Sequence, residues 1–97
     1  MATYRAIVAS PVGLHARPAA VFVRAVVETG LAVTIAKVAA GTGAATDARS
    51  ILGVLALDVG CGDEVELTAV GPTADCVLAE LAELLAAEIA DGAQLPE

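Results

Sequence analysis

The residues best suited to chemistry lie in one short segment, Gly13–Ala20, which reads Gly-Leu-His-Ala-Arg-Pro-Ala-Ala and holds the only histidine of the chain. His15 follows a glycine turn, and Arg17 stands two residues later. A neutral imidazole is a nucleophile near neutral pH, and a guanidinium pairs well with phosphate oxygens. Together these residue types indicate chemistry on a phosphoryl group.

Pro18 and the apolar run after it predict that a helix begins in this segment. Proline is favoured at the first helical position, because the N–H that it lacks would have no partner there. With Pro18 at that position, His15 lies just ahead of a helix N-terminus, where backbone N–H groups and the helix dipole attract anions. A lone histidine is most often a surface residue or a hydrogen-bond partner, but this setting favours a chemical role.

Length and composition predict a single domain over residues 1–97, with residues 91–97 as a frayed tail. Hydrophobic residues make up 58% of the 97, enough for one core. No apolar run reaches the ~18–20 residues of a membrane span, and the N-terminus lacks the apolar block of a secretory signal. We therefore expect a cytoplasmic protein with no direct membrane insertion.

The formal net charge of −7 argues against a nucleic-acid partner, since such partners need a basic face. The charge is uneven: before residue 47 the only acidic residue is Glu28, whereas most of the basic residues lie there, namely Arg5, Arg17, Arg24 and Lys37. A locally basic surface around His15 would attract acidic partners or phosphate.

The two cysteines, Cys61 and Cys76, lie fifteen positions apart without a CxxC pairing. In a small cytosolic chain such cysteines are expected to be reduced, and the pattern assigns them no role. With one histidine and no ligand spacing, no metal site is expected. No cofactor is expected either.

Apolar periodicity predicts the order β-α-β-β-α-β-α. The expected strands cover residues 3–9, 31–38, about 44–48 and 64–70, and the expected helices cover about 15–29, a short stretch after Ser50, and 73–91. The first helix should bury Ala19, Phe22 and Val26. One-sided alternation, as in Val65, Leu67 and Ala69, leaves an apolar sheet face for helices to cover, which predicts an α+β two-layer domain.

Residues at the ends of these elements indicate where they begin and stop. Gly30 is a natural C-terminal stop, whereas Ser50 and Thr73 are expected N-caps. The strand over 31–38 places four residues on one side, namely Leu31, Val33, Ile35 and Lys37. The buried stripe of the last helix is expected to comprise Val77, Leu78, Leu81, Leu84, Leu85 and Ile89.

The segment around His15 closely resembles the histidine-containing phosphocarrier (HPr) family of the bacterial sugar phosphotransferase system. A second segment, Arg49–Leu55, is similar to the family's serine-headed short helix, and the later strand and helix fall in the expected order. The resemblance thus spans essentially the whole chain. It implies an open-faced β-sandwich, in which a four-stranded antiparallel sheet is covered on one side by three helices.

The resemblance also implies a relay. Phosphorylated enzyme I, with phosphoenolpyruvate as the ultimate donor, would place a phosphoryl group on Nδ1 of His15, which passes it to a sugar-specific enzyme IIA. Arg17 matches the arginine that steadies the phosphoryl group. The chain would be a phosphoryl carrier and not an enzyme, and a carrier that meets several partners in turn is expected to be a monomer.

Partner docking is implied at other positions, each with a plainer alternative. Arg24 matches a basic docking position but also suits an i, i+4 pair with Glu28. The family's apolar docking patch corresponds to Ile51, Leu52 and Leu55, which could equally be core residues.

Ser50 has two interpretations. An N-cap alone accounts for serine there, whereas in some bacteria the family's matching serine is phosphorylated by a dedicated kinase, which would add a serine kinase/phosphorylase to the partners. Two other functions are also compatible with the sequence: a related carrier in a nitrogen-regulatory or dihydroxyacetone kinase relay, and a non-catalytic regulatory binding module. Retention of His15 and Arg17 counts against the binding module.

Overall fold

The computed structural model describes residues 1–9, 13–14, 16–38 and 45–87. Within these ranges the elements follow the expected order. They are β1 (Ala2–Ile7), α1 (Ala16–Thr29), β2 (Thr34–Lys37), β3 (Thr46–Asp47), α2 (Ile51–Ala56), β4 (Glu64–Ala69) and α3 (Ala74–Ala86). No helix in these ranges is long and apolar enough to cross a membrane.

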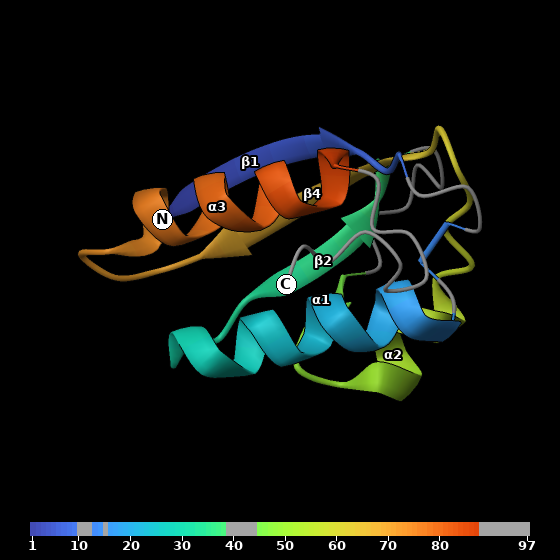
Figure 1. Cartoon of the computed structure of the whole chain (residues 1–97). Helices are drawn as coiled ribbons and strands as arrows, with labels where there is room; N and C mark the ends of the chain where they lie inside the picture. The colour runs from blue at the N-terminus through green and yellow to red at the C-terminus, as the bar shows by residue number, and fades with distance from the viewer. Residues whose placement is uncertain (10–12, 15, 39–44, 88–97) are drawn as a thin grey trace, which may run out of the picture.

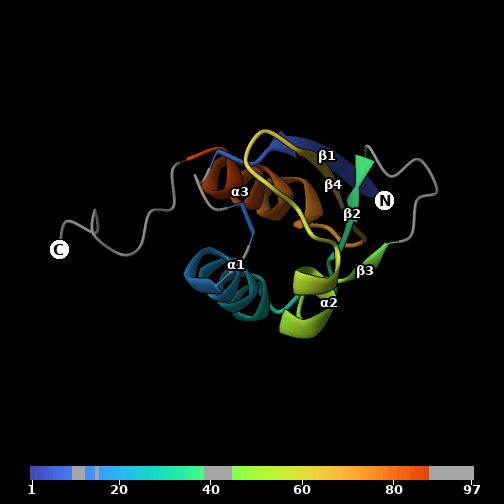
Figure 2. The ribbon, with the colours of Figure 1, turned by 90° about the vertical axis from the view of Figure 1, so that its right-hand side faces the viewer.

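The strands form one antiparallel sheet in the order β1-β4-β2-β3 (Figure 2), and Figure 1 shows β1, β4 and β2 side by side. The last strand in sequence is therefore a central one: Leu67 of β4 lies opposite Tyr4 of β1 on one side and Ile35 of β2 on the other. Seen from the side in Figure 2, the helices lie together on one face of this sheet. This confirms the predicted open-faced sandwich.

The pleat of β4 decides which face the helices cover. Val65, Leu67 and Ala69 are buried and alternate with half-exposed residues, as predicted. Phe22 of α1 and Leu78 of α3 are fully buried in the same core. Each large apolar side chain buried in this way contributes roughly 1.5–3 kcal/mol to folding, which is why the apolar face cannot be left open.

Helix α1 has the predicted buried stripe and the predicted end. Ala19, Phe22 and Val26 have no exposed surface, whereas the neighbouring Val27 is 54% exposed. The helix stops at Gly30, whose φ of 77° lies in the left-handed region and whose N–H donates to the Val27 carbonyl at 3.2 Å. This is how glycine commonly ends a helix.

Helix α3 differs from its prediction at both ends. It ends at Ala86, not at residue 91, because Ala87 has an extended backbone (ψ 153°). Thr73 occupies the N-cap position but its side chain makes no capping hydrogen bond, since its ψ of 7° is not the extended conformation of a capping residue. The first turn is instead entered through a backbone bond from Ala74 N–H to the Gly71 carbonyl (3.1 Å).

The predicted stripe of α3 is only partly a core. Leu78, Leu81 and Leu85 are buried, whereas Val77 and Leu84 are half-buried. Ile89 and the predicted tail over 91–97 lie outside the described residues.

All four strands are shorter than predicted, and hydrogen bonds explain the ends of two of them. β1 ends at Ile7, and the N–H of Ala9 donates to the Leu85 carbonyl (3.1 Å) instead of to a neighbouring strand. β2 starts at Thr34, because Leu31 lies in the turn that follows α1, where its N–H donates to Thr29 Oγ1 (3.1 Å).

Candidate functional site

The backbone that leads into α1 is held against a distant part of the chain. Gly13 has a φ of 70°, which favours glycine, and a Cβ there would collide with the Val59 carbonyl oxygen and lie 2.6 Å from Gly60 Cα. Leu14 is fully buried, and its N–H donates to the Val59 carbonyl at 2.9 Å. Residues 13 and 14 are therefore fixed by the connection between α2 and β4.

His15 lies outside the described residues, so its predicted place is not tested by the geometry. Its two neighbours in sequence are described, and α1 begins at Ala16. The start of the helix agrees with the predicted range of about 15–29. Pro18, however, is the third residue of the helix and not the first, as its type predicted. The difference has a physical reason: all N–H groups of a first helical turn lack an intrahelical acceptor, so proline is tolerated throughout that turn.

The two arginines of α1 both have exposed side chains. Arg17 lies in the first turn, and Arg24 is seven residues further along, so both face the same side of the helix. Arg24 Nε lies 3.6 Å from Glu28 Oε2 in the predicted i, i+4 ion pair. Such an exposed pair contributes only ~0.3–0.5 kcal/mol, which leaves the Arg24 guanidinium accessible to a partner.

The three apolar residues predicted for docking divide into two groups. Leu52 is 76% and Ile51 38% exposed, whereas Leu55 is half-buried and packs against the core. The fully buried residue of α2 is Val54. Figures 1 and 2 show α2 beside α1. We call Ile51 and Leu52 the α2 apolar patch.

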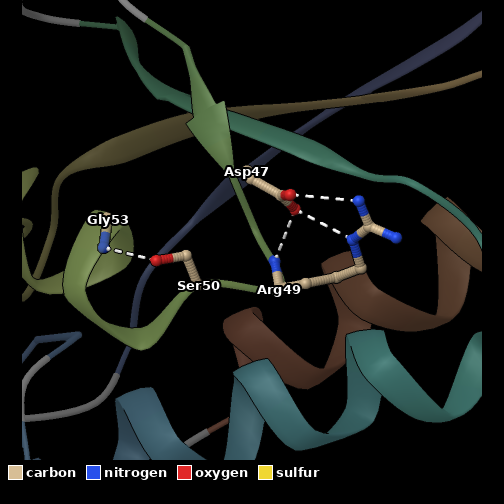
Figure 3. A network of polar contacts seen from close by, with 4 residues as sticks. All are labelled: Asp47, Arg49, Ser50 and Gly53. Carbon is tan, nitrogen blue, oxygen red and sulfur yellow. Dashed lines mark hydrogen bonds and ion pairs between the residues drawn. The ribbon is translucent and has the colours of Figure 1, made fainter.

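Ser50 is the N-cap of α2, as predicted. Its Oγ accepts a hydrogen bond from Gly53 N–H at 3.1 Å, and its backbone is extended (Figure 3). Gly53 also lets α2 lie close to β3, because a Cβ at this position would collide with Thr46 Oγ1. Ser50 therefore has a structural use that does not depend on phosphorylation.

The residues before the cap form a compact charged turn (Figure 3). Asp47 Oδ1 accepts from the backbone N–H and Nε of Arg49 at 2.9 and 3.1 Å, and Oδ2 accepts from Nη2 at 3.1 Å. The Arg49 side chain and then its backbone N–H lower the pKa of Asp47 below 3.8. This turn sets the direction in which the chain enters α2.

A second charged group, which sequence reasoning missed, lies in the connection that holds Gly13 and Leu14. Asp63 Oδ2 accepts from Gly60 N–H at 2.8 Å and lies 3.4 Å from Lys37 Nζ. The Gly60 N–H, followed by Lys37, lowers the pKa of Asp63 below 3.8. The available signal was Lys37 itself, a lysine on the inward side of an apolar strand.

Both cysteines, Cys61 and Cys76, are exposed and have free thiols. Across the described ranges, no cluster of three His, Cys, Asp or Glu side chains could hold a metal ion.

Comparison with known proteins assigns the family. Residues 3–87 match the family described as "PTS HPr component phosphorylation site". The chain belongs to the HPr family. Similar proteins include the phosphocarrier protein HPr of Streptomyces coelicolor, which is 46% identical over 74 residues, 76% of each chain.

Solved HPr structures share this fold. The phosphocarrier protein HPr of Bacillus anthracis is 32% identical with a TM-score of 0.78, over 87% of this chain and 95% of the other. An HPr dimer from Thermoanaerobacter tengcongensis is 33% identical with a TM-score of 0.61, over 74% and 78%. The chain is thus an HPr-family phosphocarrier of the phosphotransferase system.

Proposed function

We propose that this HPr-family chain accepts a phosphoryl group on Nδ1 of His15 from phosphorylated enzyme I, with phosphoenolpyruvate as the ultimate donor. It then passes the group to a sugar-specific enzyme IIA, so it is a carrier and not an enzyme. The observation that carries the proposal is the Gly-Leu-His-Ala-Arg-Pro sequence at the start of α1. No cofactor is needed, because the group moves from one nucleophile to another.

The start of α1 supports this chemistry. A helix N-terminus favours negative charge and disfavours a protonated imidazole nearby. It therefore favours both the nucleophilic form of His15 and the phosphorylated product. Arg17, exposed on the first turn, supplies a guanidinium that can stabilise the phosphoryl oxygens. Transfer of this kind requires positioning and charge stabilisation more than a general base.

The exposed surface around α1 and α2 supports docking of protein partners. Arg24 supplies an accessible cation, and the exposed α2 apolar patch supplies apolar surface that a partner would bury on binding. Leu55, the third residue that the family resemblance places in the docking patch, is half-buried and packs against the core, so it offers a partner less surface than Leu52. We expect enzyme I and enzyme IIA to dock on this combination of a cation and an apolar patch.

A labelling experiment tests the proposal. The protein is incubated with enzyme I and labelled phosphoenolpyruvate, and the stability of the label is measured. We expect acid-labile, base-stable label that is absent from His15→Ala and is acquired slowly by Arg17→Ala. A competent enzyme I that leaves the wild-type protein unlabelled would overturn the proposal and favour a binding module. Which enzyme IIA removes the label separates the sugar branch from a nitrogen-regulatory or dihydroxyacetone kinase relay.

Three further parts of the proposal have separate tests. Phosphorylation of Ser50 by a serine kinase would give acid-stable phosphate that mass spectrometry locates and that Ser50→Ala abolishes. Sedimentation equilibrium should give the mass of a monomer. Fractionation of cells should recover the protein in the cytoplasm.

A further inference from the structure

The geometry beneath the start of α1 depends on one loop. The connection from residue 57 to residue 63 carries the Val59 carbonyl that accepts from Leu14 N–H (2.9 Å), and the Gly60 backbone against which Gly13 lies. Leu14 and Val59 are both fully buried. The loop therefore fixes the backbone of the two residues that precede His15 in the chain.

Asp63 stabilises the conformation of this loop. Its Oδ2 accepts from Gly60 N–H at 2.8 Å, and its own N–H donates to the Gly60 carbonyl at 3.0 Å. These two bonds close a tight turn at Gly60, the residue whose Cα would lie 2.6 Å from a Cβ at Gly13. A change in the Asp63 side chain is thus transmitted to Gly13 through one intervening residue.

Lys37 fixes the other end of the loop from β2. Its Nζ donates to the Asp58 carbonyl at 3.0 Å and lies 3.4 Å from Asp63 Oδ2. Asp58 has a φ of 55°, which residues other than glycine rarely adopt. The ammonium therefore holds the loop at both of its ends, and with its side chain only 25% exposed it is partly shielded from solvent.

We propose that Asp63, assisted by Lys37, is a positioning residue for phosphoryl transfer at His15. The carboxylate holds Gly60, Gly60 and Val59 hold Gly13 and Leu14, and these two residues set the backbone that continues into His15. This inference rests on the proposed function of His15. It adds a requirement for the shape of the 57–63 loop that lies outside the phosphorylation motif.

The expected consequence is a defect in the transfer step and not in docking. Reaction rates between bound groups depend steeply on geometry, and a displacement of ~1 Å can cost ~100-fold. Docking should be unaffected, because among the described residues the side-chain bonds of Asp63 and Lys37 run to Gly60, Asp58 and each other, whereas Arg24 pairs with Glu28.

Four variants test the proposal through the kinetics of His15 phosphorylation by enzyme I. Asp63→Ala should lower the rate at saturating enzyme I by about tenfold or more, with little change in KM. Asp63→Asn should keep most of the rate, because the amide oxygen can still accept from Gly60 N–H. Lys37→Met should fall between them. The control is Glu66→Gln, which removes an exposed 3.3 Å ion pair with Arg5 and should match wild type.

Hydrogen exchange provides a readout that does not depend on activity. The Leu14 N–H should exchange faster in Asp63→Ala and Lys37→Met than in wild type, whereas amides of the β1–β4 ladder should not change. If Asp63→Ala does not fold, Asp63→Asn and Lys37→Met carry the comparison.

Two outcomes separate this inference from the proposed function. If the wild-type protein is not labelled at His15, both the proposed function and this inference are contradicted. A labelled wild-type protein whose Asp63→Ala and Lys37→Met variants react at the wild-type rate, or show only a raised KM, overturns this inference alone.

Discussion

At the scale of single residues, the site depends on a glycine that the phosphorylation chemistry itself does not need. Gly13 combines a positive φ with contact against Val59 and Gly60, so it is required twice, by conformation and by space. Gly30 has a similar φ of 77° but has no atom within 4 Å of an added Cβ. Substitution of the two glycines can therefore separate the cost of backbone strain at a positive φ from the cost of steric overlap of an added Cβ.

We expect Gly13→Ala to destabilise the protein more than Gly30→Ala. Both variants should lose about 1–2 kcal/mol to the left-handed conformation, and Gly13→Ala should lose a further ~1–3 kcal/mol to the overlap. Urea unfolding at pH 7 measures both. Equal losses would show that a Cβ at Gly13 does not overlap with the 57–63 loop in solution.

The ionisation of Asp63 should appear in the acid stability of the protein. Its pKa is lowered from 3.8 in the folded protein by the Gly60 N–H and then by Lys37. A lowered pKa means that the stabilisation is complete above 3.8 and is lost as the pH falls through the folded value. Asp63→Asn should therefore lose stability less steeply than wild type between about pH 4 and pH 2.

Urea midpoints measured over that range test this linkage. Asp47, whose pKa Arg49 lowers in the same direction, remains in both proteins and contributes equally to both curves. Parallel curves for wild type and Asp63→Asn would contradict the role of the Asp63 charge.

At the scale of elements, two helices start with a hydroxyl residue but only one of them uses it. Ser50 has an extended backbone and caps α2 through Gly53 N–H, whereas Thr73 precedes α3 without a side-chain bond. Helix α2 has only six residues, and short helices are marginal without such contacts. The cap should therefore matter more for α2 than the propensity of its residues.

We expect Ser50→Ala to lower the free energy of unfolding by ~1 kcal/mol, the usual value of an N-cap. Thr73→Ala should change it by less than about 0.5 kcal/mol, since no capping bond is lost. Thermal unfolding of the two variants, with hydrogen exchange of the Gly53 amide, makes the comparison. A Thr73→Ala loss as large as that of Ser50→Ala would be inconsistent with these caps.

At the scale of the whole molecule, burial separates two classes of apolar residue. Each helix buries part of its apolar side chains in the core against the sheet. In contrast, Leu52 of the α2 apolar patch and Val70, which follows β4, are 76% and 70% exposed. Only Leu52 lies on α2, next to α1, which begins one residue after His15.

We expect Leu52→Asp to raise the KM for enzyme I by about tenfold while leaving stability within ~0.5 kcal/mol of wild type. Val70→Asp is the matched control, because it adds the same charge at a similarly exposed apolar residue and should leave the KM unchanged. An equal rise in both variants would show that added negative charge, and not the patch, weakens docking.

Local patterns were sufficient for much of the fold and for the family. Alternation identified the buried face of β4, helical periodicity identified Ala19, Phe22 and Val26, and the serine before α2 identified its cap. The segment around His15 identified the HPr family. These signals are read within a few residues, because secondary structure and capping depend on near neighbours.

The remaining features required the folded chain. That Leu55 faces the core while Leu52 faces solvent depends on how α2 is seated, and the early end of α3 follows from the extended backbone of Ala87. The contact between Gly13 and Gly60 joins residues 47 positions apart, and Lys37 reaches Asp63 from a different strand. Local periodicity carries no information on such pairs, because sheet order and strand register bring them together. The sequence alone was thus enough to predict phosphoryl chemistry and the order of the helices and strands. Only the tertiary structure decided which distant residues support the backbone that leads into α1.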